Sequence, residues 1–368
     1  MIHVMDVNFE QAKKFFETGV GHYEAGRYAQ AEAQFAAALA LMPGRVSVLT
    51  NLGAARLKLG KLQEAAELLD EALVKEPDNV EALGHRATVM AETGHKQAAL
   101  ELISRAVQLA PSLGPAWTLR GTLLRELGHA LEAAVSFRNA IENGGDRELN
   151  RYYLAAVGAG EPPRAAPRKY VQSLFEGYAE GFDDHLVHVL KYRAPEILAE
   201  GLRRIKPEYE AVLDLGCGTG LCGPLLRPLA RRLEGIDLSQ NMVERATARK
   251  VYDSVIQADL VEYLSSTDRR YDAIVAADVF IYVGALEEVF MGVSRVIETG
   301  GVFCFSVEEA AAGRELELHP SLRYAHSRGY IQSLAARNGF EIVHTEAHPI
   351  REDQQAPISG LYAWLVKS

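Results

Sequence analysis

Apolar positions recur with a helical spacing over the first 150 residues, and the whole pattern repeats every 34 residues. Each unit carries a glycine between two helical patterns, then a large apolar residue, then a small alanine. The glycines are Gly26, Gly60, Gly94 and Gly128, the large residues are Phe35, Leu69, Ile103 and Phe137, and the alanines are Ala38, Ala72, Ala106 and Ala140. The pattern predicts a pair of antiparallel helices per unit, with the glycine in the turn between them.

The repeated units span 12–45, 46–79, 80–113 and 114–147, and a helix over 147–158 is predicted to cap the stack. The small alanine lets neighbouring helices approach, and the large apolar residue fills the space between them. This pattern resembles the tetratricopeptide repeat family, whose opening signature is matched by Trp117 and Gly121 in the fourth unit. Residues 1–158 are therefore expected to form an α-helical solenoid.

The resemblance implies that the repeats hold a peptide or a protein on their concave face. Some members of the family close a five-residue clamp on a C-terminal carboxylate, and this clamp is largely missing here. Asn51 occupies one of its positions, whereas the other four hold Phe16, Val20, Glu81 and His85. A receptor for chaperone tails is therefore not expected. An array that only forms a homo-oligomer, or only shields the rest of the chain, is the alternative.

From about residue 211 the pattern changes to short apolar strands. The strand candidates are 211–215, 233–237, 254–259, 271–279, 300–308, 340–347 and 361–368. Helical patterns separate the first five, which predicts an α/β domain with a doubly wound, mostly parallel sheet of seven strands. Ligands of such sheets lie at the carboxyl ends of the strands.

The segment before this domain is rich in proline, glycine and charge. Residues 159–169, which contain the basic run Arg164 to Lys169, are predicted to be a solvated linker. Residues 170–368 would then form the second domain, and the helical segment 170–205 at its start is expected to act as a lid.

The stretch VLDLGCGTGL, Val212 to Leu221, places three alternate glycines directly after a strand. Without side chains at Gly216, Gly218 and Gly220, a ligand can approach the backbone, whose N–H groups bind carboxylates and phosphates. A dinucleotide-binding fingerprint would place its third glycine at position 221, which is a leucine.

The G-x-G-x-G spacing after an acidic residue is similar to that of class I S-adenosylmethionine-dependent methyltransferases, and segments 271–284 and 300–308 match later strands of that superfamily. The lid segment resembles that of small-molecule methyltransferases related to quinone biosynthesis. With the repeats, almost the whole chain resembles a bacterial group of methyltransferases fused to tetratricopeptide repeats. The resemblance implies S-adenosylmethionine as cofactor and S-adenosylhomocysteine as product.

The resemblance also assigns cofactor contacts. Asp237 would bind the ribose diol, Met242 the adenine ring, Asp259 the adenine amino group, and Asp214 the loop and the amino group of the cofactor. The complete expected set is Asp214, Gly216, Cys217, Gly218, Gly220, Asp237, Leu238, Met242, Asp259, Leu260 and Ala277. A strand-terminal aspartate can instead be only a helix N-cap, and Met242 can be plain core.

Methyl transfer needs alignment more than acid–base chemistry, so a general base is optional. Asp278 and Tyr282 follow the fourth strand, and His326 is the preferred base because histidine titrates near neutrality. The alternative for His326 is a surface-loop histidine. Acceptor contacts are expected from Tyr178, Phe182, Glu308, Arg323 and Tyr324.

Composition narrows the remaining choices. Residues 1–150 carry 15 Lys and Arg against 19 Asp and Glu, and residues 151–368 carry 24 against 30, so binding to nucleic acid is not expected. The three cysteines fit neither a disulfide framework nor a zinc pattern, and no metal site is predicted. No membrane span or secretory signal is apparent, which favours a cytoplasmic protein.

The sequence therefore predicts a methyltransferase that acts on an oxygen or nitrogen of a small-molecule, carrier-bound or protein acceptor, with the repeats recruiting a partner or shaping access. One alternative is an aminopropyltransferase, which uses a similar sheet and would need further carboxylates near the fourth strand. The other is a binding scaffold whose methyltransferase fold is not catalytic.

Overall fold

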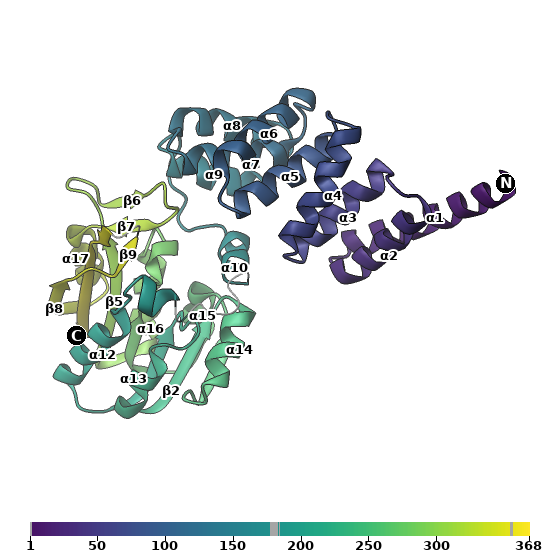
Figure 1. Ribbon diagram of the computed structural model, residues 1–368. Helices are drawn as coiled ribbons and strands as arrows, with labels where there is room; N and C mark the ends of the chain where they lie inside the picture. The colour runs from purple at the N-terminus through teal and green to yellow at the C-terminus, as the bar shows by residue number, and fades with distance from the viewer. Residues whose placement is uncertain (1, 177–182, 184, 354–355) are drawn as a thin grey trace. The chain divides into compact units, whose positions relative to one another are not determined.

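The protein divides into two compact units, Met1–Gly160 and Glu161–Ser368. Its structure is a computed structural model that describes residues 2–176, 183, 185–353 and 356–368 (Figure 1). The predicted fold class is confirmed, because helical repeats precede an α/β unit with a mostly parallel sheet.

The first unit consists of antiparallel helix pairs followed by one further helix (Figure 1, purple to blue). The helices are α1 (Ile2–Glu24), α2 (Tyr28–Leu41), α3 (Val46–Lys58), α4 (Leu62–Lys75), α5 (Val80–Glu92), α6 (Lys96–Leu109), α7 (Gly114–Glu126), α8 (Ala130–Glu142) and α9 (Arg147–Ala156). The repeated glycines lie in the turns within each pair and have φ between +71° and +83°, a conformation that side chains disfavour.

Small residues set the close packing of each pair. A Cβ atom built on Gly121 would lie 2.5 Å from the ring of Phe137, and one built on Gly53 would lie 2.8 Å from Leu69. The repeated alanines and large apolar residues are all buried. The last helix, α9, buries Tyr152 and Tyr153 against the stack. The apolar positions that repeat along the sequence are thus the positions at which successive helices contact one another.

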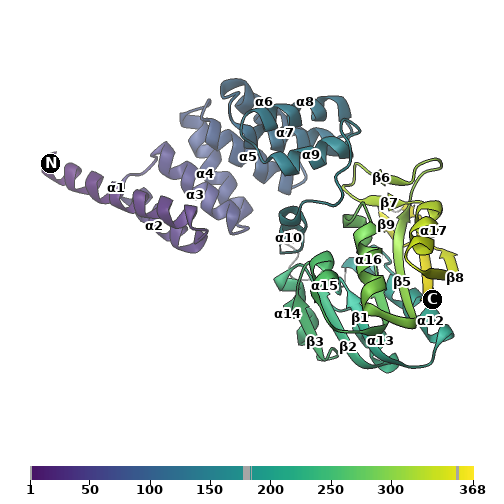
Figure 2. The ribbon, with the colours of Figure 1, turned by 180° about the vertical axis from the view of Figure 1, so that it is seen from behind.

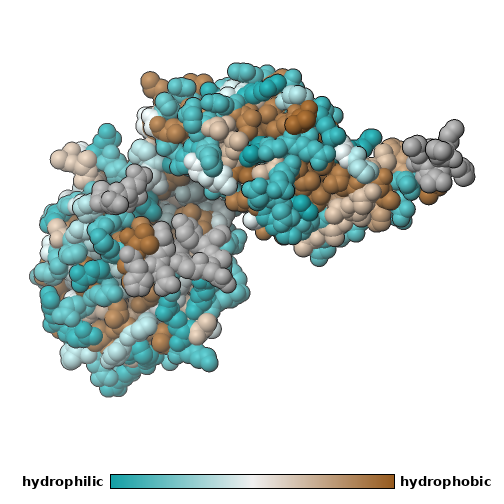
Figure 3. All heavy atoms as spheres, in the orientation of Figure 1, coloured by the Kyte–Doolittle hydropathy of each residue, from teal (hydrophilic) through white to brown (hydrophobic). Residues whose placement is uncertain are grey.

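The first helices of successive pairs contact one another, α1 with α3, α3 with α5 and α5 with α7. These helices therefore line the inner side of the solenoid. Figure 3 shows hydrophobic residues between polar ones on the visible face of this unit.

The second unit is built on one large sheet (Figure 2). Its main strands are β1 (Tyr209–Leu215), β2 (Ala230–Asp237), β3 (Ser254–Gln257), β4 (Tyr271–Ala276), β5 (Ile297–Glu309), β8 (Phe340–Ala347) and β11 (Gly360–Lys367). Their spatial order is β3-β2-β1-β4-β5-β11-β8, with β1 to β5 parallel and β11 antiparallel to both of its neighbours. Between β1 and β4 the direction of winding reverses, which is where open α/β sheets bind ligands.

Helices cover both faces of this sheet (Figure 2). The helical segments are α10 (Arg168–Glu176), η1 (His185–Val189), α12 (Ala194–Ile205), α13 (Gly223–Leu226), η2 (Arg227–Leu229), α14 (Gln240–Ala248), α15 (Leu260–Ser266), η3 (Phe280–Tyr282), α16 (Glu287–Val296) and α17 (Arg328–Arg337). One core cluster joins the sheet to α15, α16 and α17, and the other joins it to α12 and α13.

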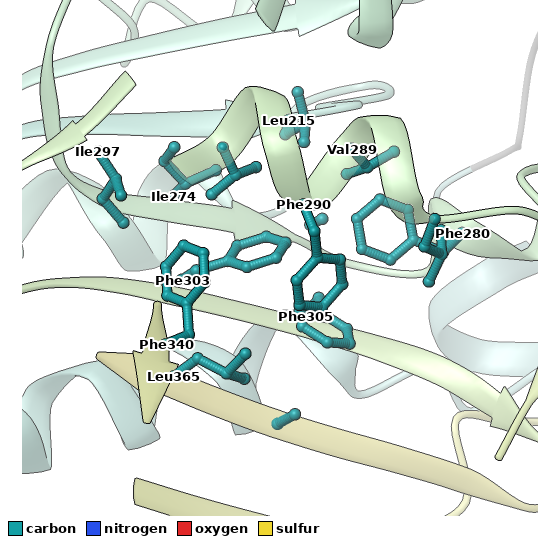
Figure 4. Packing of buried hydrophobic residues seen from close by; sticks show 14 of the residues in the cluster. Leu215, Ile274, Phe280, Val289, Phe290, Ile297, Phe303, Phe305, Phe340 and Leu365 are labelled. Carbon is teal, nitrogen blue, oxygen red and sulfur yellow. The ribbon is translucent and has the colours of Figure 1, made fainter. Parts of the chain in front are cut away.

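Successive side chains of a strand point to opposite faces of the sheet, so they belong alternately to the two core clusters. On β5, Phe303 and Phe305 face the first cluster while Cys304 faces the second. Figure 4 shows Phe290 of α16 packed against Phe303 and Phe305, with Phe340 beside them, and their ring centroids lie 5.5–6.2 Å from Phe290. Burial of this apolar surface fixes the strand ends that carry the site.

Two short strand pairs lie outside the seven predicted strands; the first joins the large sheet, and the second forms a separate two-stranded sheet. β6 (Leu316–Leu318) pairs with β7 (Tyr324–His326), and β7 also pairs with β5. β9 (Arg351–Asp353) pairs with β10 (Ala356–Ile358). These additions bring residues that the sequence places in loops into buried positions.

The predicted linker 159–169 and lid 170–205 differ from the structure in part. Ala166 N–H donates to Tyr282 O at 2.9 Å, and Ala285 N–H donates to Arg164 O at 2.8 Å, so the end of the predicted linker pairs with the second unit. In the predicted lid, α12 packs on the sheet, because a Cβ atom on Gly201 would lie 2.2 Å from Trp364. Among the described residues of this segment, the site is bordered by α10, by residues before α12 and by Pro195 in the first turn of α12.

Over the described ranges, every helix is too short or too polar to cross a membrane.

Candidate functional site

A pocket of about 310 Å³ lies at the carboxyl ends of the central strands, at the point where the winding reverses. The glycine loop and the end of β2 form one part of its wall, and η3, Arg323 and Arg351 form another. α10 contributes Val171, Leu174 and Phe175. The pocket therefore extends across the strand ends from β2 towards β4.

The glycine loop turns sharply after β1. Gly216, Gly218 and Gly220 all have positive φ, at +75°, +54° and +86°. A Cβ atom on Gly216 would lie 2.6 Å from Val279, whereas one on Gly218 would meet nothing within 4 Å. Gly216 and Gly218 line the pocket, so open space above Gly218 is space available to a ligand.

Asp237, at the end of β2, holds this loop in place through a hydrogen bond. Its Oδ2 accepts the Gly218 N–H at 2.9 Å, and its Oδ1 accepts the Ser239 N–H at 2.9 Å. Burial raises the pKa of the Asp237 carboxyl, and the backbone N–H groups oppose this shift. The carboxylate lines the pocket and still has lone pairs free to accept from a ligand. Ser239 is the N-cap of α14, so Asp237 is not a helix cap.

Asp214 lies beneath the loop and is 1% exposed. Its Oδ2 accepts the Tyr252 hydroxyl at 2.6 Å, while its Oδ1 has no partner among the described residues. Burial raises the pKa of Asp214 to about 7, although the bond from Tyr252 lowers it. The Tyr252 ring also lies within 3.2 Å of the positions that Cβ atoms on Gly220, Gly223 and Gly235 would take. Tyr252 therefore supports the loop from below.

Replacing Tyr252 by phenylalanine is expected to destabilise the protein more at pH 8 than at pH 5. Because the folded pKa of Asp214 lies above its unfolded value, Asp214 lowers stability as pH rises from about 4 through 7. The variant loses a bond to a neutral carboxyl at pH 5, about 1 kcal/mol, and a bond to a carboxylate at pH 8, about 2–3 kcal/mol. Urea unfolding at both pH values measures this, and an equal loss at both would contradict it.

At the other cofactor positions, Met242 is buried and lines the pocket. Asp259 also lines the pocket and is the N-cap of α15, where its Oδ1 accepts the N–H groups of Val261 and Glu262 at 2.9 and 3.2 Å. Its Oδ2 lies 3.4 Å from Arg168 of α10. Cys217, Leu238, Leu260 and Ala277 line the same pocket.

The structure places two of the three expected catalytic residues at the pocket and the third outside it. Asp278 and Tyr282 line the pocket. His326 does not, because β7 joins the sheet and leaves its imidazole 0% exposed, with Nε2 donating to Val283 O and Gly284 O at 3.0 and 2.9 Å. Burial lowers the pKa of His326 to about 4. His326 is thus neither a surface-loop histidine nor placed to accept a proton from a ligand.

Of the expected acceptor contacts that the structure describes, one lines the pocket and two do not. Arg323 lines the pocket, whereas Tyr324 is buried in β7 and its hydroxyl donates to Pro163 O at 2.8 Å. Glu308 lies behind the pocket wall, in contact with Arg351. Tyr178 and Phe182 fall outside the described residues. Asp214 and Gly220 support the glycine loop and are not part of the pocket lining.

Sequence reasoning missed three residues at the site. Arg351 lies on β9 within a polar segment, Tyr252 lies in a turn after α14, and Arg168 lies in the predicted linker. Arg351 begins a three-residue strand that the sequence does not predict, and neither Tyr252 nor Arg168 sits in a motif or at a strand end. Only the folded chain brings them to the pocket or beneath it.

Among the described residues, no group of three or more His, Cys, Asp or Glu is placed to hold a metal ion.

Two family models each match a part of the chain. A methyltransferase domain model matches residues 213–305, and a tetratricopeptide repeat model matches residues 16–75 and 50–113. The chain is 24% identical over 201 residues to a sterol 24-C-methyltransferase of Gibberella zeae, covering 49% of this chain and 50% of that protein. It is 28% identical over 169 residues to a malonyl-[acyl-carrier protein] O-methyltransferase of Halalkalibacterium halodurans, covering 43% and 61%.

Among solved structures, the N-methyltransferase NodS of Bradyrhizobium japonicum, in complex with S-adenosylhomocysteine, shares 20% identity at a TM-score of 0.43, covering 53% of this chain and 97% of that one. The chain spans about half to three-fifths of the length of the two curated relatives.

Proposed function

We propose that this chain transfers a methyl group from S-adenosylmethionine to an oxygen or nitrogen of an acceptor. A methyltransferase domain model matches residues 213–305, and a tetratricopeptide repeat model matches residues 16–75 and 50–113. The observation that carries the proposal is the pocket at the strand ends, with open backbone at Gly218 and carboxylates at the ends of β2 and β3. S-adenosylmethionine is the cofactor, and it supplies an activated methyl group on a sulfonium when bound.

The described residues fit this cofactor. The open space above Gly218 leaves the backbone of the glycine loop accessible to a ligand that carries a carboxylate. We assign Asp237 to the ribose hydroxyls, and Met242 with Leu260 to the adenine ring. Asp259 can accept from the adenine amino group through Oδ2, since Oδ1 is occupied as a helix cap.

The chain's remaining task is to align the acceptor and exclude water. Asp278 and Tyr282 take this role in our proposal, and α10 covers the pocket with Val171 and Phe175. The Phe175 and Tyr282 rings meet edge to face, with centroids 5.6 Å apart. Burial raises the pKa of the Tyr282 hydroxyl, which therefore stays protonated and can donate a hydrogen bond.

The acceptor is a small molecule, a carrier-bound group or a protein side chain. A carrier-bound acceptor is supported by the malonyl-[acyl-carrier protein] relatives, since their names describe such an acceptor. We assign the repeats to recruiting the acceptor or its carrier. Their inner helices offer charged side chains for this purpose, such as the exposed Lys58 of α3 and Glu92 of α5.

Transfer of a labelled methyl group tests the proposal. The full chain, S-adenosylmethionine labelled on the methyl group, and a cell extract separated into small-molecule and macromolecular fractions would be incubated together. We expect label in at least one fraction, and less of it with the Asp237→Ala variant when S-adenosylmethionine is kept below saturation. Equal labelling by the two proteins would contradict the assignment of this pocket.

The repeats are tested by charge reversal at Lys58. We expect Lys58→Glu to lower labelling of a macromolecular acceptor about two- to fivefold, because exposed ion pairs contribute up to about 1 kcal/mol. The affinity for S-adenosylhomocysteine should not change. Lys75→Glu on α4, a second helix of its pair, is the matched control. Labelling that falls equally in both variants would contradict a role for the inner helices.

A further inference from the structure

Three charged side chains from separate strands meet beside the pocket. Arg351 of β9 donates through Nη1 to Asp278 Oδ2 at 2.6 Å and through Nη2 to Glu308 of β5. Arg351 is 2% exposed, and Asp278 lies two residues after the end of β4. The guanidinium is thus held between two carboxylates, a contact that links the ends of β4, β5 and β9.

Two atoms of this cluster lack a hydrogen-bond partner among the described residues, Asp278 Oδ1 and Arg351 Nε. Both residues line the pocket, whereas Glu308 does not. Buried polar atoms are nearly always paired in folded proteins, so an unpaired acceptor at a pocket wall marks a place for a ligand atom. Asp278 also has a φ of +57°, and such backbone conformations concentrate at functional sites.

The charges of the cluster decide which ligand atom fits. Arg351 is already paired with two carboxylates. The free position on Asp278 is a hydrogen-bond acceptor, because an ionised carboxylate has no proton to donate. An N–H or O–H group satisfies it, while a carboxylate would place its oxygens against a like charge.

We propose that Asp278 Oδ1 receives the N–H or O–H of the methyl acceptor, so that the acceptor is an amine or a hydroxyl compound and not a carboxylate. The inference rests on the proposed function of the same pocket. Arg351 acts as a positioning residue, since it holds Asp278 through Oδ2 and leaves Oδ1 without a partner among the described residues.

The reaction balances without a further reactant. The acceptor nitrogen or oxygen forms a bond to the methyl carbon, and the carbon–sulfur bond breaks with its electron pair going to sulfur. The proton of the N–H or O–H group goes to Asp278 Oδ1. Asp278 thereby takes the place that the sequence gives to His326.

Three matched probes test the inference on the full chain saturated with S-adenosylhomocysteine: benzylamine, benzyl alcohol and benzoate. They share one ring and differ in the group that would meet Asp278. Calorimetric titration is expected to give dissociation constants for the amine and the alcohol at least tenfold below that for benzoate. The Asp278→Asn variant should reduce this preference to less than threefold. Asparagine tolerates a positive φ, so the variant is expected to fold.

Asp272→Asn is the matched control. Asp272 lies at the other end of β4, where its carboxylate accepts the backbone N–H groups of Glu210 and Ala211. This variant should keep the full preference. Benzoate binding as tightly as the other probes, binding of no probe, or a preference that survives Asp278→Asn would each overturn the inference.

Titration of the same sample with S-adenosylhomocysteine distinguishes failure of the proposed function from failure of the Asp278 assignment. Failure to bind it contradicts the proposed function itself. Binding of it without the probe preference overturns only the assignment of Asp278 and the acceptor class.

Discussion

The Gly218→Asp variant is expected to fold and to lose S-adenosylhomocysteine binding at least about 100-fold, which corresponds to about 2.7 kcal/mol. A Cβ atom at Gly218 meets nothing within 4 Å, and aspartate tolerates the local φ of +54°. The new side chain would therefore occupy space next to the pocket without disturbing the core. Its charge would also stand close to Asp237, whose Oδ2 accepts the N–H of residue 218.

Two other glycines serve as controls for this substitution. Gly313→Asp has the same change at a position with φ +84° and open space around it, away from the pocket lining, and should keep full affinity. Gly216→Ala should instead destabilise the fold, because its Cβ would lie 2.6 Å from Val279. Circular dichroism melting and calorimetric titration measure both properties. Retained affinity in a folded Gly218→Asp protein would show that the ligand lies elsewhere.

The Asp237→Ala variant is expected to weaken S-adenosylhomocysteine binding by about 1–3 kcal/mol. The substitution removes the carboxylate assigned to the ribose hydroxyls, and it also releases the Gly218 N–H. Hydrogen bonds to charged groups are the stronger ones, so the loss should exceed that of a neutral contact.

The control for Asp237 is Asp253, which lies just before β3 and contacts β2 away from the pocket. Asp253 accepts the Leu233 N–H at 2.7 Å and pairs with Arg227, so Asp253→Ala removes a similar carboxylate outside the pocket. It should leave affinity unchanged while lowering stability. If both variants bind S-adenosylhomocysteine with wild-type affinity, Asp237 has no role in the site.

The repeats could be predicted from sequence because their determinants are local. A glycine with positive φ in each turn and a buried alanine in each second helix follow a fixed period, so one unit explains the next. The strands of the sheet were predictable for a similar reason, since buried parallel strands are continuous apolar runs. The glycine loop and Asp237 follow the ends of two such runs. Because parallel strands end at the same edge of a sheet, the sequence predicts that these residues lie close together.

The acceptor side of the pocket could not be predicted in the same way. His326 and Tyr324 lie in a polar segment that reads as a loop, but pairing of β7 with β5 buries both side chains. Arg351 comes from a segment without apolar periodicity, and only its tertiary contacts with Asp278 and Glu308 identify it. The linker residues Arg164 and Ala166 pair with the loop after β4 through backbone groups, which carry no sequence signal.

The central claim is that the pocket at the strand ends binds S-adenosylmethionine. Calorimetric titration of the full chain with S-adenosylhomocysteine, with NADH as the control ligand, tests it most directly. The account predicts micromolar binding of S-adenosylhomocysteine and none of NADH. Binding of NADH in its place, or of neither ligand, would contradict it.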